Sequence, residues 1–221
     1  MSIHLLTRYG LSLGGSGGPA IQVIGTTTLG HNDTSQATSH VVPLPEGYAA
    51  GDLLVLCVSS QSAPVAPDGW SEDTFNNSNR NLFWRYATGG EGETVTFTTS
   101  IASRRAVNAY AIRGVAGTPQ AQTAVGVAAY DFAPEGFTDQ PTIWIGGILA
   151  PAGYDAFSIP SSFTDPVHTY NALTTATNRR QALSAHLITT GASIDVSDDP
   201  FTLRDPNPFT ADPFMFGVQA T

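Results

Sequence analysis

The run Leu53-Leu-Val-Leu-Cys-Val58, within the longer stretch Gly51-Asp-Leu-Leu-Val-Leu-Cys-Val-Ser-Ser60, decides the fold class. A short run that is apolar at every position, entered from a glycine, indicates a β-strand that is covered on both faces. Further along the chain, Glu93-Thr-Val-Thr-Phe-Thr98 alternates polar and apolar residues, which is typical of a strand with one buried face. Together the two patterns predict an all-β protein with more than one layer.

Similar segments recur along the chain, rich in β-branched or aromatic residues and ended by Gly, Pro, Asn or Asp. Charged residues make up 12% of the chain, about half the usual fraction, while Gly (22) and Pro (15) are abundant, as in short strands joined by turns. The Ala-rich stretch 171–185 is the one plausible short helix. The expected strands are 20–28, 39–44, 52–60, 81–87, 93–99, 106–113, 121–128, 142–150, 181–189 and 214–219.

The two halves of the chain carry a similar order of motifs. The stretch from Gly51 leads to Pro67-Asp-Gly-Trp70, and Pro141-Thr-Ile-Trp-Ile-Gly-Gly-Ile-Leu-Ala150 leads to Ile159-Pro-Ser-Ser-Phe163. A single sheet built from one half would leave an apolar face bare, so two such sheets are expected to pack face to face. We therefore expect a single pseudo-symmetric antiparallel β-sandwich, jelly-roll-like, over residues 20–221, with halves of about 20–117 and 118–221. Two independent domains, or chance similarity between β-rich halves, are the alternatives.

Residues 1–19 form a separate segment by composition, an apolar stretch followed by the flexible hinge Gly14-Gly-Ser-Gly-Gly-Pro19. We interpret it as a short N-terminal arm that anchors the protein to a neighbouring subunit. A frayed terminus and a folded-back edge strand are the alternatives. The expected assembly-contact residues are Ile3, Leu5, Leu6, Tyr9, Leu11 and Leu13.

The net charge of −9 argues against a nucleic-acid partner, because no basic patch is available to neutralise phosphates. No apolar stretch is long enough to cross a bilayer, so membrane insertion is not expected, and the N-terminus lacks the pattern of a signal peptide. The single cysteine, Cys57, lies in the apolar run and is expected to be a core residue rather than a nucleophile.

No pattern of catalytic or metal-binding residues is present. The five histidines lack metal-ligand spacing, and neither a nucleophile elbow nor a phosphate-binding loop occurs. Calcium in the acidic loops Asp195-Val-Ser-Asp-Asp199 and Asp205-Pro-Asn-Pro208 is conceivable, but a solvated loop is favoured. Glu72 and Asp73 are the carboxylates considered for glycoside cleavage. We therefore expect a non-enzyme with no catalytic, cofactor-binding or metal-ligating residues and no cofactor.

The motifs of the first half resemble a loosely defined group of β-sandwich proteins that are encoded among the structural genes of tailed phages, prophages and gene transfer agents. The resemblance covers roughly residues 25–115, and the second half shares it through the repeat. It is carried by Gly51-Asp-Leu-Leu-Val55, Pro67-Asp-Gly-Trp70, Leu82-Phe-Trp-Arg-Tyr-Ala-Thr-Gly89, Glu93-Thr-Val-Thr-Phe97 and Ala109-Tyr-Ala-Ile-Arg-Gly-Val115.

This resemblance implies a structural component of a phage or phage-like particle, such as a head spike or fibre, a decoration protein or a tail-associated protein. Its partners would be other virion proteins (capsid, portal, tail or fibre) and further copies of itself, and its location the virion, assembled in the host cytoplasm. A carbohydrate-binding module that contacts host surface glycan is the alternative, and an enzyme is least favoured. Trp70, Trp84 and Trp144 are expected in the core rather than on a sugar-stacking surface.

Overall fold

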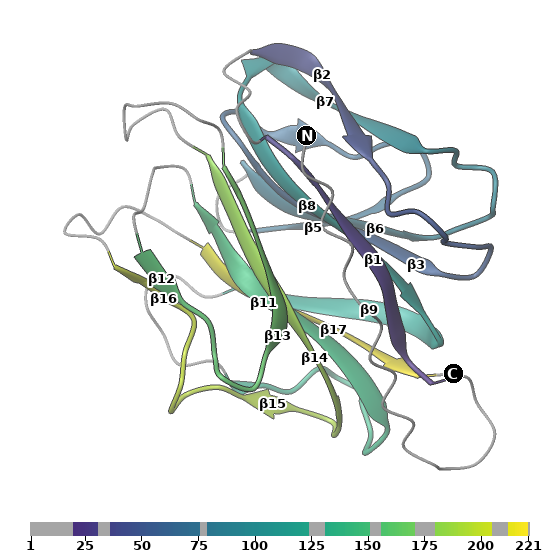
Figure 1. The fold of residues 1–221 in the computed structure, drawn as a ribbon, viewed down its shortest axis with the longest axis vertical. Helices are drawn as coiled ribbons and strands as arrows, with labels where there is room; N and C mark the ends of the chain where they lie inside the picture. The colour runs from purple at the N-terminus through teal and green to yellow at the C-terminus, as the bar shows by residue number, and fades with distance from the viewer. Residues whose placement is uncertain are drawn as a thin grey trace.

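The computed structural model describes residues 20–30, 36–75, 79–123, 131–150, 156–170, 180–204 and 212–220. In these ranges the regular secondary structure consists of antiparallel β-strands, and the expected all-β sandwich is confirmed (Figure 1). The first five-stranded sheet has the order β1 (Gln22–Leu29), β8 (Arg105–Arg113), β3 (Leu53–Ser60), β6 (Arg80–Tyr86), β5 (Ser71–Thr74). The second has the order β13 (Thr164–Tyr170), β14 (Gln181–Thr190), β11 (Pro141–Ala150), β17 (Asp212–Ala220), β9 (Val115–Thr123).

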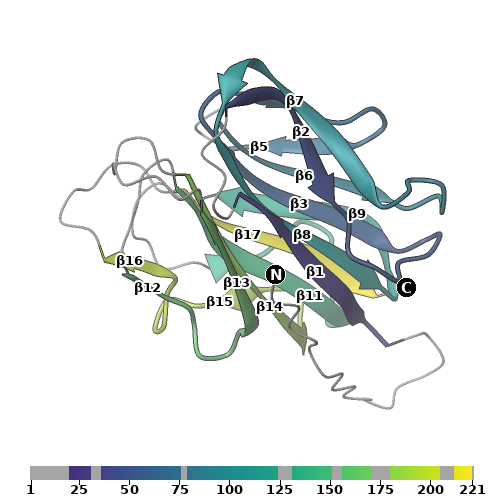
Figure 2. The same ribbon diagram turned by 45° about the horizontal axis from the view of Figure 1, so that its top comes forward.

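The two five-stranded sheets pack face to face and bury a common core (Figure 2). Leu53 and Val55 of β3 point into this core from one side, and Ile143 and Ile145 of β11 enter it from the other. Because each sheet comes from one half of the chain, the apolar face that one half leaves bare is covered by the other half.

A second layer covers the other face of the first sheet. This outer sheet has the order β2 (Ala37–Pro43), β7 (Thr94–Ser103), β4 (Pro64–Val65). Leu54, Leu56 and Val58 point toward it and pack with Val42 and Phe97. The run Leu53–Val58 is therefore buried on both faces, as its unbroken apolar sequence predicts.

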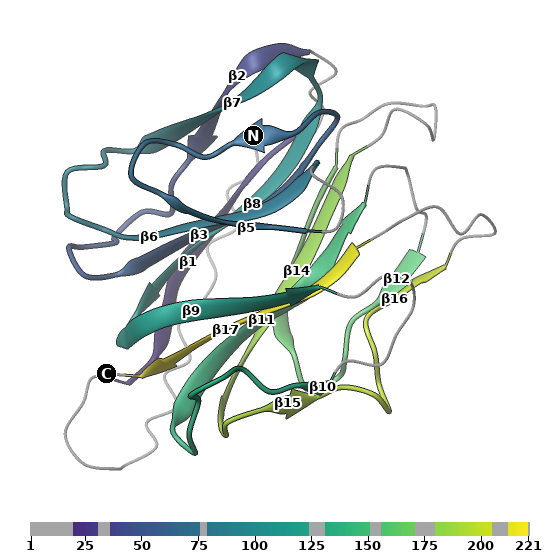
Figure 3. The same ribbon diagram turned by 180° about the vertical axis from the view of Figure 1, so that it is seen from behind.

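The far face of the second sheet is covered in a similar way. Two short strand pairs lie there, β10 (Asp131–Phe132) with β15 (Ile194–Asp195) and β12 (Ala156–Ser158) with β16 (Thr202–Arg204) (Figure 3). Trp144 and Met215 of the second sheet form a third apolar cluster with Phe132 and Ile194. The molecule therefore has four layers, with the two five-stranded sheets in the middle.

Both halves follow one topology. In the first half the first strand pairs with the last, the last with β3, and β3 with β6, while β2 and β4 flank β7. The second half repeats this topology. Its five-stranded sheet has the order β9, β17, β11, β14, β13, which corresponds to β1, β8, β3, β6, β5 of the first half. The pairs β10–β15 and β12–β16 correspond to the pairs β2–β7 and β4–β7. This is the strand order of a jelly roll, except that β5 lies beside β6. The junction between the two units lies at Gly114, between β8 and β9, a few residues before the expected boundary.

Equivalent turns mark corresponding positions in the two units. The Trp70 N–H donates to the Pro67 carbonyl at 3.1 Å, and the Phe163 N–H donates to the Pro160 carbonyl at 2.9 Å. Both aromatic rings are buried, and each stands directly before the fifth strand of its unit.

A second pair of turns repeats even more closely, and our sequence comparison missed it. Pro45-Glu-Gly-Tyr48 and Pro134-Glu-Gly-Phe137 each precede the third strand of their unit. Gly47 and Gly136 have φ angles of 82° and 79°, a left-handed conformation that favours glycine. The turn chemistry therefore explains why the P-E-G sequence occurs in both units.

The expected short helix is wrong for residues 181–185, which belong to β14. This strand has partners on both sides, β13 and β11, and residues Gln181 to His186 are buried in succession. The two hydrogen-bonded ladders and the burial of both faces outweigh the helix propensity of alanine here. Residues 171–179 lie outside the described part of the chain. The structure also adds β13, whose polar sequence with Pro166 at a sheet edge gave no strand signal.

Candidate functional site

The contact residues expected on the N-terminal arm (Ile3, Leu5, Leu6, Tyr9, Leu11 and Leu13) lie outside the described residues, as does the loop that begins at Asp205. The candidate site is therefore sought on the sandwich itself. Three of its features bring polar or apolar groups together: the outer sheet, the space between the two five-stranded sheets, and the turns at the sheet ends.

The outer face of the β2–β7–β4 sheet is the candidate contact surface. Val41 of β2 and Val65 of β4 are 52% and 56% exposed there, and Ile101 of β7 is 60% exposed within the register shift between Thr98 and Ser103. None of these three strands contains Asp, Glu, Lys or Arg, although the chain carries a net charge of −9. An exposed sheet face and edge without charge is the kind of surface that pairs with other chains.

The register of the outer sheet places these side chains in neighbouring rows. Val41 pairs with Thr96, and Thr98 stands between Ser39 and Val65. From Thr94 to Thr99 the exposed positions of β7 are all threonines, since this part of the strand alternates exposed and more buried positions. The surface is therefore a row of hydroxyl-bearing side chains flanked by valines. The alternating sequence of β7 predicted that one face of this strand is exposed. The sequence does not show that β2 and β4 pair with β7 and bring their valines beside it.

A polar cluster lies between the two five-stranded sheets. The Asn108 side-chain amide on β8 donates to the Ser184 Oγ at 2.8 Å, to the Ala182 carbonyl at 3.1 Å and to the Val167 carbonyl at 3.0 Å. The Tyr110 hydroxyl lies 2.6 Å from the same Ser184 Oγ. Because Asn108, Tyr110 and Ser184 are completely buried, the cluster holds the two sheets in one register rather than facing a substrate.

His186 and Asp165 extend this cluster toward the edge strand β13. The His186 Nε2 lies 3.8 Å from the Asp165 Oδ2, and burial lowers the pKa of His186 while the charge of Asp165 raises it. Ser184, His186 and Asp165 do not form a nucleophilic triad, because the Ser184 Oγ is engaged by the Asn108 amide and the Tyr110 hydroxyl. Asp165 has a φ of 48° at a register shift of β13, where the left-handed conformation is strained for a residue that precedes proline.

Arginines from both units gather where β3 ends. Arg80 pairs with Ser59 and Arg105 pairs with Ser60, while the Arg180 Nε of the other unit donates to the Ser60 carbonyl at 3.0 Å. Burial, together with the charges of Arg80 and Arg104, lowers the pKa of Arg180 to about 10. The contact to Ser60 shows a structural role, tying the start of β14 to the end of β3 across the sheets.

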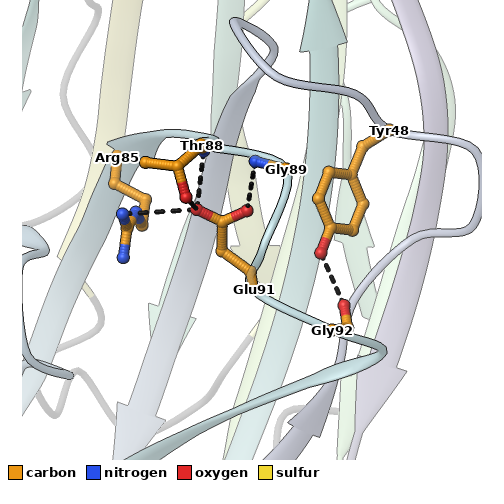
Figure 4. Close-up of polar contacts among 6 residues, drawn as sticks. All are labelled: Tyr48, Arg85, Thr88, Gly89, Glu91 and Gly92. Carbon is orange, nitrogen blue, oxygen red and sulfur yellow. Dashed lines mark hydrogen bonds and ion pairs between the residues drawn. The ribbon is translucent and has the colours of Figure 1, made fainter.

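Glu91 organises the turn between β6 and β7 (Figure 4). Its carboxylate accepts hydrogen bonds from the Thr88 N–H at 2.7 Å, the Thr88 hydroxyl at 2.8 Å and the Gly89 N–H at 3.0 Å, and it lies 3.2 Å from the Arg85 guanidinium. Burial raises the pKa of Glu91, but these hydrogen bonds outweigh it and hold the pKa at about 2. A carboxylate so fully engaged by its own turn is a structural anion, not a general acid.

The acidic turns bind their own backbone as well. A shallow cavity of about 150 Å³ is lined by Pro160 and the segment 195–199. There the Ser197 N–H donates to Asp195 and the Ser161 N–H donates to Asp199. Hydrogen bonds from the side chain and backbone of Ser197 lower the pKa of Asp195, and those from the backbone and side chain of Ser161 lower the pKa of Asp199. In the described ranges no group of three His, Cys, Asp or Glu side chains is placed to hold a metal ion.

Glu72 and Asp73 do not converge as a catalytic pair would. Glu72 accepts hydrogen bonds from Thr74 and Asn81, whereas Asp73 accepts one from the Trp84 Nε1–H at 3.0 Å. As neighbours on β5, their side chains point to opposite faces of the sheet. Burial raises the pKa of Asp73, the Trp84 hydrogen bond lowers it, and the charge of Glu72 raises it.

The residues expected in the core are found there. Trp144 and Cys57 are completely buried, Trp70 is buried, and Trp84 is partly buried against the core between the sheets. Burial raises the pKa of the Cys57 thiol well above its usual range, so the thiolate that a nucleophile needs is disfavoured. These placements confirm the core interpretation of the three tryptophans and the cysteine.

Comparison with known proteins gives no relative. No family model matches the chain, and neither the curated proteins nor the solved structures include a significant match. In the described part of the chain, no helix has the length and apolar character needed to span a membrane.

Proposed function

We propose that the chain is a non-catalytic structural component of a phage or phage-like particle, a surface appendage attached through its N-terminal arm. Jelly rolls serve in viral capsids and in lectins, so the topology supports the proposal by fold-level analogy. The observation that carries it is the charge-free outer face of β2–β7–β4 on a chain of net charge −9. Such a face suits permanent contact with another protein better than contact with solvent.

The charged side chains of the sandwich that have structural roles support the same proposal. The Arg113 guanidinium and the Asp52 carboxylate form an ion pair at 2.7 Å, and Glu91 holds its turn together. These side chains stabilise loops at the ends of the sheets, where the binding sites of sandwich proteins usually lie. A rigid block of this kind contributes shape and contact surface to an assembly.

The arm is tested by incorporation into particles. In the host, a chain in which residues 1–13 are replaced by a Gly/Ser sequence of equal length should fail to copurify with particles, while the unmodified chain copurifies. A control that replaces the exposed Ile188 with Glu keeps the arm and should copurify normally. Normal incorporation of the arm-replaced chain would refute attachment through the arm.

Binding to host surface glycan is the second proposal, and lectin use of the jelly roll supports it by analogy. Sugar-binding modules usually stack an exposed aromatic ring on the sugar. The aromatic side chains whose exposure the structure describes are buried or partly buried, so this support is weaker. A glycan array probed at high protein concentration distinguishes the two, because a pure contact protein gives no signal on any glycan.

A further inference from the structure

We propose that residues 3–13 of one copy dock, as an extended strand, on the charge-free outer face of β2–β7–β4 of a second copy. The inference rests on the proposed function, in which the arm joins subunits, and it names the surface that receives the arm. Two independent features carry it, the side-chain pattern of the arm and the charge distribution of the chain.

The arm has the pattern of a strand with one apolar face. Ile3, Leu5, Tyr9, Leu11 and Leu13 all stand at odd positions, so an extended chain directs them to one side. Leu6 is the large apolar residue among the even positions, which otherwise carry His4, Arg8, Gly10 and Ser12. An extended segment from 3 to 13 spans about 35 Å, close to the length of a ten-residue strand such as β7.

The receiving surface offers matching apolar contacts. Val41, Val65 and Ile101 are each more than half exposed, and they come from three strands of the same sheet. β2 and β4 are the edge strands of this sheet, so their outer backbone groups can pair with an added strand. A strand added at either edge would lie beside Val41 or Val65, and its apolar side would continue the outer face of the sheet.

Charge favours this contact between copies. The first 19 residues contain Arg8 and no Asp or Glu, so they carry +1, and the remainder of the chain carries −9 − 1 = −10. The negatively charged sandwiches of two copies repel each other, and this repulsion is weakest where they meet at a face without charged side chains. The arm brings a positive charge to this face, where the exposed Glu93 stands directly before β7.

The test measures the mass of the full-length protein by light scattering and sedimentation from roughly 1 to 100 µM, a range that covers weak subunit contacts. The unmodified chain should form dimers or larger oligomers. Leu11→Glu in the arm and Val41→Glu on the face should each weaken association at least tenfold, because each buries an unpaired charge. The matched controls Ser12→Glu, on the other side of the arm, and Ile188→Glu, an exposed apolar residue on β14, should associate like the unmodified chain.

Every outcome decides the proposal. A chain that stays monomeric over the whole concentration range overturns docking on a second copy. If Val41→Glu weakens association but Leu11→Glu does not, two copies contact each other through their outer faces without the arm, and the proposal is also overturned. Weakening by Leu11→Glu alone shows that the arm docks elsewhere. Cooperative unfolding of each variant checks its fold, and Val65→Glu replaces Val41→Glu if that variant does not fold.

The two proposals fail separately. If the arm attaches to a different virion protein, Val41→Glu leaves particle incorporation unchanged while replacement of the arm abolishes it. In that case the inference about the second copy is wrong and the proposed function stands.

Discussion

Asn108 on β8 and Ser184 on β14 meet between the two five-stranded sheets, where the Asn108 Nδ2 donates to the Ser184 Oγ at 2.8 Å. The same amide reaches the carbonyls of Val167 and Ala182, so its two N–H groups are shared among three acceptors of the second unit. Both side chains are completely buried. The two units are thus joined by oriented hydrogen bonds as well as by apolar contact.

Replacing Asn108 with Leu should lower the free energy of unfolding by about 2–4 kcal/mol, because it removes three hydrogen bonds and leaves their buried acceptors without this donor. Urea denaturation of the purified protein measures this cost. Thr98→Ala on the exposed outer face is the control, and it should change the free energy by less than about 0.5 kcal/mol. A loss below about 1 kcal/mol for Asn108→Leu would show that the polar cluster does not hold the sheets together.

The sequence predicts those strands whose pattern of apolar residues follows directly from which of their faces are buried. The run Leu53–Val58 predicted a strand covered on both faces, and the alternation from Glu93 to Thr98 predicted a half-buried one. Both patterns depend on local alternation, which a single sequence displays fully. The similar order of motifs in the two halves likewise predicted two sheets packed face to face, which the shared core between β3 and β11 shows.

The remaining features depend on pairing between distant segments. Arg80, Arg105 and Arg180 converge because β3 has β6 and β8 as neighbours and faces the start of β14, none of which follows from spacing. β13 escaped prediction since an edge strand needs few apolar residues. The exposed Val41 and Val65 likewise form one surface only after β7 brings their strands together.

His186 should make the stability fall as the solution becomes mildly acidic. Its pKa in the folded protein lies below the ordinary value of 6.5, because burial disfavours the charged form. The unfolded chain therefore binds the proton first, and the stability that His186 contributes above pH 6.5 is lost as pH falls toward the folded pKa. Urea midpoints at about pH 7.5 and pH 5.5 should differ more for the unmodified protein than for His186→Gln.

A second variant tests the assignment to this histidine. The charge of Asp165 raises the pKa of His186, so Asp165→Asn should lower it further and widen the pH range over which stability is lost. NMR titration of the imidazole follows the pKa directly. An unchanged His186 pKa in Asp165→Asn would contradict the contact that the 3.8 Å distance indicates.

Gly147 on β11 should tolerate no side chain. A Cβ at this position would lie 2.1 Å from the Leu183 carbonyl oxygen and 2.9 Å from the Phe214 ring, and the backbone of β14 cannot move away without breaking its ladder. Gly147→Ala is expected to cost at least about 3 kcal/mol. Gly90→Ala is the matched control, since its nearest atom would be the Thr88 hydroxyl at 3.9 Å, and it should leave the melting temperature unchanged or slightly raised.

Glu91 should stabilise the β6–β7 turn at neutral pH and lose this effect in acid. Its pKa of about 2 lies below the ordinary value of 4.5, so the stability it contributes is complete above pH 4.5 and disappears as pH falls toward 2. Glu91→Gln removes an acceptor of charge-assisted hydrogen bonds from Thr88 and Gly89 and should cost about 1–2 kcal/mol at neutral pH.

The decisive measurement is the pH dependence of that cost. Urea denaturation at neutral pH and at about pH 3 should show the difference between Glu91→Gln and the unmodified protein shrinking in acid, because protonation removes the same charge from Glu91 that the variant lacks. Glu93→Gln, an exposed carboxyl two positions along the same turn, should leave stability unchanged at both pH values. A cost that is equal at both pH values would mean that the side-chain shape of Glu91, rather than its charge, holds Thr88 and Gly89 in place.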